Sequence, residues 1–231
     1  MLQKCTLNLQ EIKKAFDLYP MSGVTTNPTI ISKEKRNFID ILKEIRNEID
    51  EDKMLHVQVI SQKAEEIVKE AEYLKELIGG NIYIKISVIP EGIKAIKILK
   101  KKGINITATD IFTAEQALMA AIAGAQFVAP YVNRIDNISG NGVDVVVQII
   151  QLFKAHNISA KVLAVSFKNV QQVHQVALAG GQSVTVNAEV MDKLLSHPLT
   201  DSSVEQFISD WESVYGKGKY TYDVSHIEIN N

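Results

Sequence analysis

The sequence predicts an α/β fold in which eight parallel strands alternate with eight helices and close into a (β/α)8 TIM barrel. Short runs rich in β-branched residues alternate with longer stretches of helical periodicity, and no long polar linker interrupts the repeat. Eight strand-helix units within 231 residues close a barrel more naturally than they build an open sheet. A doubly wound sheet is the alternative, and the length would also fit two small domains.

The predicted strands are short, and each precedes a helical segment. They lie at Gln3–Thr6, Gly23–Thr26, Leu55–Val59, Ile82–Ser87, Ile104–Thr109, Phe127–Tyr131, Lys161–Ser166 and Ser183–Val186. The predicted helices lie at Leu9–Tyr19, Asn37–Asp50, Gln62–Ile78, Pro90–Lys102, Thr113–Ala123, Asn141–His156, Asn169–Ala179 and Ala188–His197. Helix-start signals such as Asn8 with Glu11, and glycines such as Gly103 after helical patterns, mark several of these boundaries.

A further helix is predicted at Thr200–Tyr215, beyond the complete barrel. Its apolar residues recur at helical spacing and form a stripe of Val204, Phe207, Ile208, Trp211 and Val214. We therefore predict a barrel domain over residues 1–199, followed by a C-terminal helix and tail over residues 200–231. The stripe would pack on its own chain as part of the same domain or dock on a neighbouring subunit. Residues 216–231 carry no firm structural signal.

Composition argues against several partners. The 25 basic and 27 acidic residues are spread along the chain and leave a net charge of −2, so we expect no nucleic acid and no anionic membrane as partner. The longest apolar stretch, Ala117–Val132, is interrupted by Gly124, Gln126 and Pro130, and the N-terminus has no signal-peptide pattern. The single cysteine, Cys5, excludes an internal disulfide and fits a cytoplasmic location.

Side-chain alternation along the strands predicts a polar interior at one end of the barrel. In Ile82–Ser87 the isoleucines share one parity, so Tyr83, Lys85 and Ser87 should point inward. The same reasoning turns three further polar residues inward at the carboxyl ends of their strands: Gln58, Thr109 and Ser166. Catalytic groups of this fold lie at that end of the barrel, so we expect a composite site there.

Lys85 is the candidate reactive group. Burial should lower the pKa of its amine and leave a neutral nucleophile able to attack a carbonyl; the alternative is a lysine that reaches solvent or pairs with a carboxylate. No inward Asp or Glu is evident near Lys85, and no His pair has metal-ligand spacing, which argues against a metal site. His56 is expected to be a structural residue. Gly140 and Gly142 before a helix offer weak grounds for an anion site.

Four sequence strings together resemble the transaldolase family. They are Gly23-Val-Thr-Thr-Asn-Pro-Thr-Ile-Ile31, Tyr83-Ile-Lys-Ile86, Val128-Ala-Pro-Tyr-Val-Asn-Arg-Ile-Asp136 and Ala164-Val-Ser-Phe-Lys168. The resemblance runs from about the first helix to about Tyr215 and is strongest to the short-subunit branch that contains fructose-6-phosphate aldolase. It implies a Schiff-base enzyme for sugar phosphates that needs no cofactor and no metal, and a homo-oligomer, either a pentamer or a decamer.

The resemblance also implies roles for individual residues. Lys85 would form the Schiff base, while Thr25 and Asn27 would contact the ketose or its dihydroxyacetone fragment. The phosphate would be held by Arg134, Ser166 and Lys168. A catalytic water would be held by Gln58, Thr109 and Tyr131, which would make them an acid-base relay. Because transaldolases tend to have Glu and Phe where this chain has Gln58 and Tyr131, the resemblance favours the aldolase, with transaldolase as the alternative.

Several positions depart from the family pattern. Cys5 stands where members usually have an aspartate close to the lysine, and a thiol is a poorer hydrogen-bond acceptor than a carboxylate. Ser87 replaces a common proline, Asp110 replaces a small or apolar residue, and Asn187-Ala188 replaces a proline-containing turn. The absent aspartate opens a second alternative, a weakly active or inactive barrel that binds a sugar phosphate.

Overall fold

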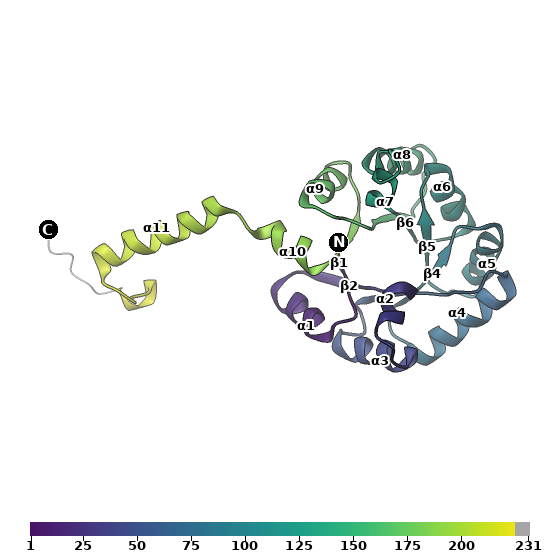
Figure 1. Cartoon of the computed structure of the whole chain (residues 1–231), viewed down its shortest axis with the longest axis horizontal. Coiled ribbons are helices and arrows are strands. Elements are labelled where there is room, and N and C mark those ends of the chain that lie inside the picture. Colours follow the sequence, from purple (N-terminus) through teal and green to yellow (C-terminus); the bar gives the residue numbers. More distant parts are fainter. Residues whose placement is uncertain (225–231) are drawn as a thin grey trace. The chain divides into compact units, whose positions relative to one another are not determined.

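The computed structural model describes residues 1–224 and divides into two compact units, Met1–Met191 and a second that begins at Asp192. The first unit contains a closed barrel whose eight parallel strands follow chain order, as predicted (Figure 1). The strands are β1 (Leu2–Cys5), β2 (Met21–Thr25), β3 (Met54–Gln58), β4 (Ile82–Ser87), β5 (Ile106–Ile111), β6 (Phe127–Pro130), β7 (Lys161–Ala164) and β8 (Ser183–Val186).

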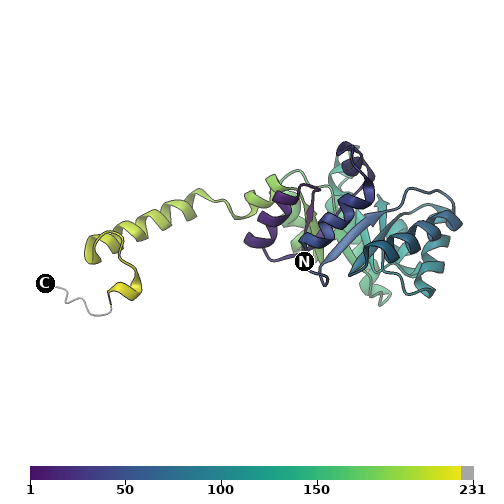
Figure 2. The same ribbon diagram turned by 90° about the horizontal axis from the view of Figure 1, so that it is seen from below.

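Helices surround the strands on the outside of the barrel (Figures 1 and 2). The long ones match the prediction: α1 (Leu9–Leu18), α3 (Phe38–Glu48), α4 (Ala64–Ile78), α5 (Pro90–Lys101), α6 (Ala114–Ala123), α8 (Gly142–Ala155), α9 (Val170–Leu178) and α10 (Ala188–Leu195). Two short helices were not predicted, α2 (Pro28–Lys33) and α7 (Val132–Asp136). The first begins where Asn27 Oδ1 accepts a hydrogen bond from the Ile30 amide at 2.9 Å, with Pro28 in the first turn.

The hydrophobic core lies between the strands and the helices. Outward-facing strand residues such as Val57, Ile84 and Ile86 are fully buried, and so are helix residues such as Ile45 and Leu99. Burying a side chain of this size stabilises the fold by about 1.5–3 kcal/mol. The core therefore fixes which face of each strand points outward, and the opposite face fills the barrel.

The barrel interior contains polar residues, among them a buried histidine. His56 Nδ1 lies 2.9 Å from Thr107 Oγ1, and its ring stacks on Tyr83 with a centroid distance of 4.9 Å. Burial, aided by the positive charge of Lys85, lowers the pKa of His56 to about 3, so the ring is neutral. These contacts fit the structural role expected for His56, although its Nε2 has no hydrogen-bond partner within residues 1–224.

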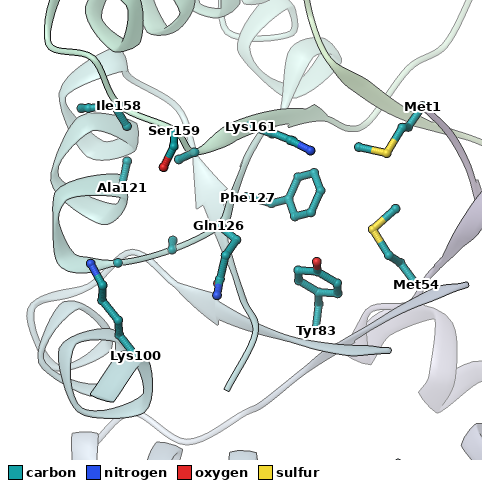
Figure 3. Close-up of a pocket in the computed structure, with 13 residues that line it drawn as sticks. Met1, Met54, Tyr83, Lys100, Ala121, Gln126, Phe127, Ile158, Ser159 and Lys161 are labelled. Carbon is teal, nitrogen blue, oxygen red and sulfur yellow. The ribbon is translucent and has the colours of Figure 1, made fainter. Parts of the chain in front are cut away.

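A cavity of about 410 Å³ lies at the amino ends of the strands. Figure 3 shows Met54, Tyr83 and Phe127, from the starts of β3, β4 and β6, turned toward the same space as Met1. It lies at the amino-terminal end of the barrel, whereas functional sites of this fold lie at the carboxyl-terminal end.

The second unit consists of the end of α10, α11 (Pro198–Tyr215) and a short 3-10 helix at Thr221–Asp223. Within it, Trp211 stacks near Tyr215 with a centroid distance of 4.2 Å and donates from Nε1 to the Lys219 carbonyl at 2.8 Å. Of the predicted tail, residues 225–231 lie outside the described residues. Throughout residues 1–224, no helix combines the length and the apolar character needed to cross a membrane.

Candidate active site

Lys85 lies inside the barrel near the carboxyl end of β4, as strand parity predicts. Only 5% of the residue is exposed, and Nζ donates a hydrogen bond to the Thr26 carbonyl at 2.7 Å. Burial lowers the pKa of its amine to about 8, while the neighbouring Cys5 and Asp110 oppose this shift and Arg134 adds to it. Roughly a tenth of the amine is then neutral at pH 7, which suits a nucleophile that attacks carbonyl groups.

The three proposed relay residues come from neighbouring elements around Lys85. Gln58 is the register partner of Lys85 across β3 and β4, and Thr109 is that of Ser87 across β4 and β5. The hydroxyl oxygens of Thr109 and Tyr131 lie 3.4 Å apart. Burial raises the pKa of Tyr131, which keeps its hydroxyl protonated. The structure therefore brings Thr109 and Tyr131 together and places Gln58 beside Lys85.

A carboxylate is also present at this site, so the expectation of no inward Asp or Glu near Lys85 is wrong. Asp110 Oδ2 accepts hydrogen bonds from Ser87 Oγ at 2.5 Å and from Gln58 Nε2 at 3.3 Å. Strict alternation along β5 assigns Asp110 to the outer face, but its φ of 58° is left-handed and turns the side chain toward the barrel mouth. In the sequence, this carboxylate was indicated by the charged residue that directly follows Thr109.

Thr25 and Asn27 lie at the carboxyl end of β2, on either side of Thr26. Thr25 is buried, and its Oγ1 lies 2.7 Å from Thr185 Oγ1 of β8, so both side chains point into the barrel. Asn27 is half-buried and uses Oδ1 to cap α2, which leaves its amide nitrogen available as a donor. The Thr-Thr-Asn-Pro segment therefore places polar groups at the rim next to Lys85.

Arg134, Ser166 and Lys168 lie on two adjacent segments after β6 and β7. The Asn133 amide donates to the Ser166 carbonyl at 2.9 Å, which joins α7 to the end of β7. The Arg134 guanidinium carbon lies 4.5 Å from the centre of the Tyr131 ring. Arg134 and Lys168 are exposed, and neither forms an ion pair with the residues that the structure describes. Both cations remain available to an anion at the mouth.

The start of α8 does not provide the suggested anion site. The Gly142 amide donates to Asp136 Oδ1 at 2.7 Å, and Asn141 Oδ1 accepts from the next two amides. The protein itself therefore occupies these donors. Gln172 Nε2 donates to Asp136 Oδ2 at 2.6 Å, which fixes α7 against α9.

Open space adjoins the lysine end of the barrel. A cavity of about 510 Å³ is lined by Gln58 and Ser87 together with apolar residues such as Ile60, Ile67 and Ile86. Within the described part of the chain, no group of three His, Cys, Asp or Glu residues could hold a metal ion. The arrangement provides a buried amine, hydroxyl and amide groups around it, and two cations at the rim.

Replacing Lys85 should reveal the cost of burying its charge. The pKa of the amine is 10.5 in its ordinary state and about 8 in the folded protein, so the unfolded chain binds more protons between these values. The cost is complete below pH 8 and is relieved as pH rises toward 10.5. We expect Lys85→Met to be about 2 kcal/mol more stable than the parent at pH 7, with the advantage lost near pH 10.5.

Urea unfolding at pH 7 and at pH 10 measures this difference. Lys97→Met, at an exposed position on α5, is the control and should change stability little at either pH. A parent protein at least as stable as Lys85→Met at pH 7 would contradict the expected cost.

Comparison with known proteins identifies the family. A family model described as Transaldolase/Fructose-6-phosphate aldolase matches residues 6–221. The chain is 44% identical over 207 residues to a "Probable transaldolase" of Clostridioides difficile (strain 630), covering 90% of this chain and 94% of that protein. It is 43% identical over 207 residues to a "Probable fructose-6-phosphate aldolase" of Streptococcus pneumoniae (strain ATCC 700669 / Spain 23F-1), covering 89% and 93%. The chain therefore belongs to the transaldolase/fructose-6-phosphate aldolase family of Schiff-base enzymes that act on sugar phosphates.

Proposed function

We propose that this protein is a class I aldolase that cleaves or forms a ketose phosphate such as fructose 6-phosphate, with a dihydroxyacetone fragment carried on Lys85. The observation that carries the proposal is the buried Lys85 amine, whose pKa is lowered to about 8, at the carboxyl end of a barrel strand. Family membership supports the same chemistry.

The Lys85 amine attacks the ketone carbon, and the resulting carbinolamine loses water to form an iminium ion. The bond between the third and fourth carbons then breaks. Its electron pair moves into the iminium to give an enamine, while the fourth carbon leaves as an aldehyde after its hydroxyl loses a proton. Protonation of the enamine and hydrolysis return free dihydroxyacetone and the lysine. Protein groups accept and donate each proton, so the sequence of steps needs no cofactor.

Gln58, Thr109 and Tyr131 would hold the water that transfers these protons. The 3.4 Å separation between the Thr109 and Tyr131 hydroxyl oxygens leaves both able to contact one further small molecule. Gln58 Oε1 is buried and has no hydrogen-bond partner within residues 1–224, so it can accept a hydrogen bond from that water. General acid-base catalysis would require each of these contacts to lie within reach of the substrate carried on Lys85.

The phosphate would bind between Arg134, Ser166 and Lys168. A guanidinium fork and an ammonium complement the charge of a phosphate dianion, and a serine hydroxyl can donate to a third oxygen. Thr25 and Asn27 would bind the hydroxyl groups of the ketose at the opposite side of the mouth. These groups would position the ketone carbon next to Lys85 Nζ.

Two alternatives remain in view. A transaldolase would use the same lysine but pass the three-carbon unit to an aldose phosphate, and one of the similar proteins carries that name. Gln58 and Tyr131 favour the aldolase.

A weakly active barrel is the second alternative because Cys5, which is half-buried, replaces the family's usual aspartate. Its unpaired thiol also supports the proposed cytoplasmic location.

Reductive trapping tests the Schiff base directly. Incubation with fructose 6-phosphate or dihydroxyacetone, followed by borohydride, should add the mass of the reduced ketone to the Lys85 peptide. Lys97→Met should label as the parent does, and Lys85→Met should not label. No adduct in the parent, under conditions that label a related enzyme, would exclude the proposed covalent chemistry.

The acceptor requirement separates the aldolase from the transaldolase. Release of dihydroxyacetone from fructose 6-phosphate should proceed at the same rate with and without an added aldose phosphate. A coupled assay for free dihydroxyacetone measures this release. Strict dependence on the acceptor would reassign the protein as a transaldolase while keeping the role of Lys85.

We also propose that the protein is a homo-oligomer, a pentamer or decamer, in which α11 docks on a neighbouring subunit. No residue of α11 is buried within the chain. The exposed apolar residues along it are Leu199, Val204, Phe207, Ile208 and Val214, which are 51% to 71% exposed. A contiguous apolar surface of this kind usually marks an interaction site.

Light scattering tests the assembly. The parent should have five or ten times the 25.7 kDa mass of one chain, and Phe207→Asp should shift it toward smaller species because it places a charge in the apolar stripe. Ser209→Asp, also exposed on α11 but outside the stripe, should leave the mass unchanged. A monomeric parent would contradict the proposal.

A further inference from the structure

Asp110 is a charged residue in an unusual backbone conformation at the rim of the candidate site. Its φ of 58° lies in the left-handed region, which costs an ordinary residue roughly 1–2 kcal/mol and is best tolerated by Gly, Asn and Asp. The pairing between β5 and β6 shifts register between Ala108 and Ile111, around this residue. The local irregularity in β5 therefore serves to direct the Asp110 side chain into the mouth.

The carboxylate contacts two neighbouring strands. Oδ2 accepts from Ser87 Oγ on β4 at 2.5 Å and from Gln58 Nε2 on β3 at 3.3 Å. Ser87 lies two residues after Lys85, and Gln58 is the register partner of Lys85. Asp110 thus joins the carboxyl ends of β3, β4 and β5 directly above the reactive lysine.

This contact determines which end of the Gln58 amide faces the site. A carboxylate can only accept hydrogen bonds, so the amide nitrogen of Gln58 must be the group that points toward Asp110. The carbonyl oxygen Oε1 is then turned away from Asp110, and it is buried without a partner among the described residues. Without the carboxylate at position 110, the two orientations of the amide would be much closer in energy.

The ionisable groups that face Lys85 come from several elements. They are Cys5 on β1, Asp110 on β5 and Arg134 on α7, while the neighbouring His56 on β3 is neutral. Asp110 is the one carboxylate that acts on Lys85 within residues 1–224. Cys5 is the other group that can carry negative charge there, and it provides a thiol at the end of β1.

We propose that Asp110 is a positioning residue that fixes the orientation of the Gln58 amide and provides the negative charge that balances the Lys85 ammonium. The proposal rests on the function assigned to Lys85 and Gln58 above. It predicts that a carboxylate placed at Cys5, which also faces Lys85, restores the charge when Asp110 is neutralised.

The first experiment measures the apparent pKa of Lys85 without any turnover. Brief reductive methylation with formaldehyde and cyanoborohydride from pH 6 to pH 10 reports the neutral fraction of the amine, read from the mass of its peptide. Asp110→Asn keeps the shape and tolerates the left-handed backbone, and it should lower the apparent pKa by about one unit. Adding Cys5→Asp should reverse the shift. Asp17→Asn, on the exposed face of α1, is the charge-matched control and should cause none.

Kinetics then test the effect on Gln58. Asp110→Asn should lower kcat for cleavage of fructose 6-phosphate by about tenfold with KM changed less than about twofold, because the phosphate contacts are untouched. Cys5→Asp should raise cleavage in the parent and recover part of the loss in Asp110→Asn. The double-mutant cycle measures this coupling between the two positions.

Asp110→Gly separates positioning from a merely structural role. Glycine accepts the left-handed conformation without strain, so the variant should unfold at the same temperature as the parent or higher, yet show the same drop in Lys85 pKa. An unchanged Lys85 pKa in both variants would overturn the proposal. Because the methylation readout needs no substrate, failure of the ketone to label Lys85 would reject the proposed function without deciding the role of Asp110.

Discussion

The strict alternation of side chains along β4 is the constraint on which the site depends. Ile82, Ile84 and Ile86 are almost completely buried against the helices, and together they stabilise the fold by about 5–9 kcal/mol. Lowering the Lys85 pKa from 10.5 to about 8 costs about 3 kcal/mol. The free energy gained by burying the three isoleucines exceeds this cost. The strand β4 therefore cannot rotate to expose Lys85 to solvent. The core therefore forces an amine into the barrel and keeps it reactive.

Residues at the carboxyl-terminal rim of the barrel hold the Lys85 amine in place. The Thr26 carbonyl, just after β2, accepts a hydrogen bond from Lys85 Nζ, so the end of β2 fixes the position of the amine. Asp110 and Ser166 both have positive φ values, 58° and 66°, at the ends of β5 and β7. These two strained residues lie at the barrel mouth, and the regular core provides the stability that tolerates them.

Much of this architecture could be predicted from the sequence, because the features that define it are periodic. The eight strands and the long helices follow from apolar patterns that extend over several residues, and parity alone placed Lys85 inside. The helices α2 and α7 span one or two turns, too short for a period to emerge, although Asn27-Pro28 was a start signal for the first. Asp110 was not predicted at the site because side-chain alternation presumes an extended backbone, and a single left-handed residue breaks it.

The proposed role of Asp110 bears on which of the family's two activities this chain carries out. The similar proteins named as a transaldolase and as an aldolase match this chain at 44% and 43% identity, so overall similarity favours neither activity. In the proposed mechanism an enamine on Lys85 is common to both activities, and its fate depends on whether it is protonated from bound water or attacks an aldose. In our proposal Gln58 Oε1 and the Tyr131 hydroxyl would hold that water, and Asp110 would orient the first of them. On the proposed function, a carboxylate on β5 would thereby favour release of the three-carbon fragment over its transfer.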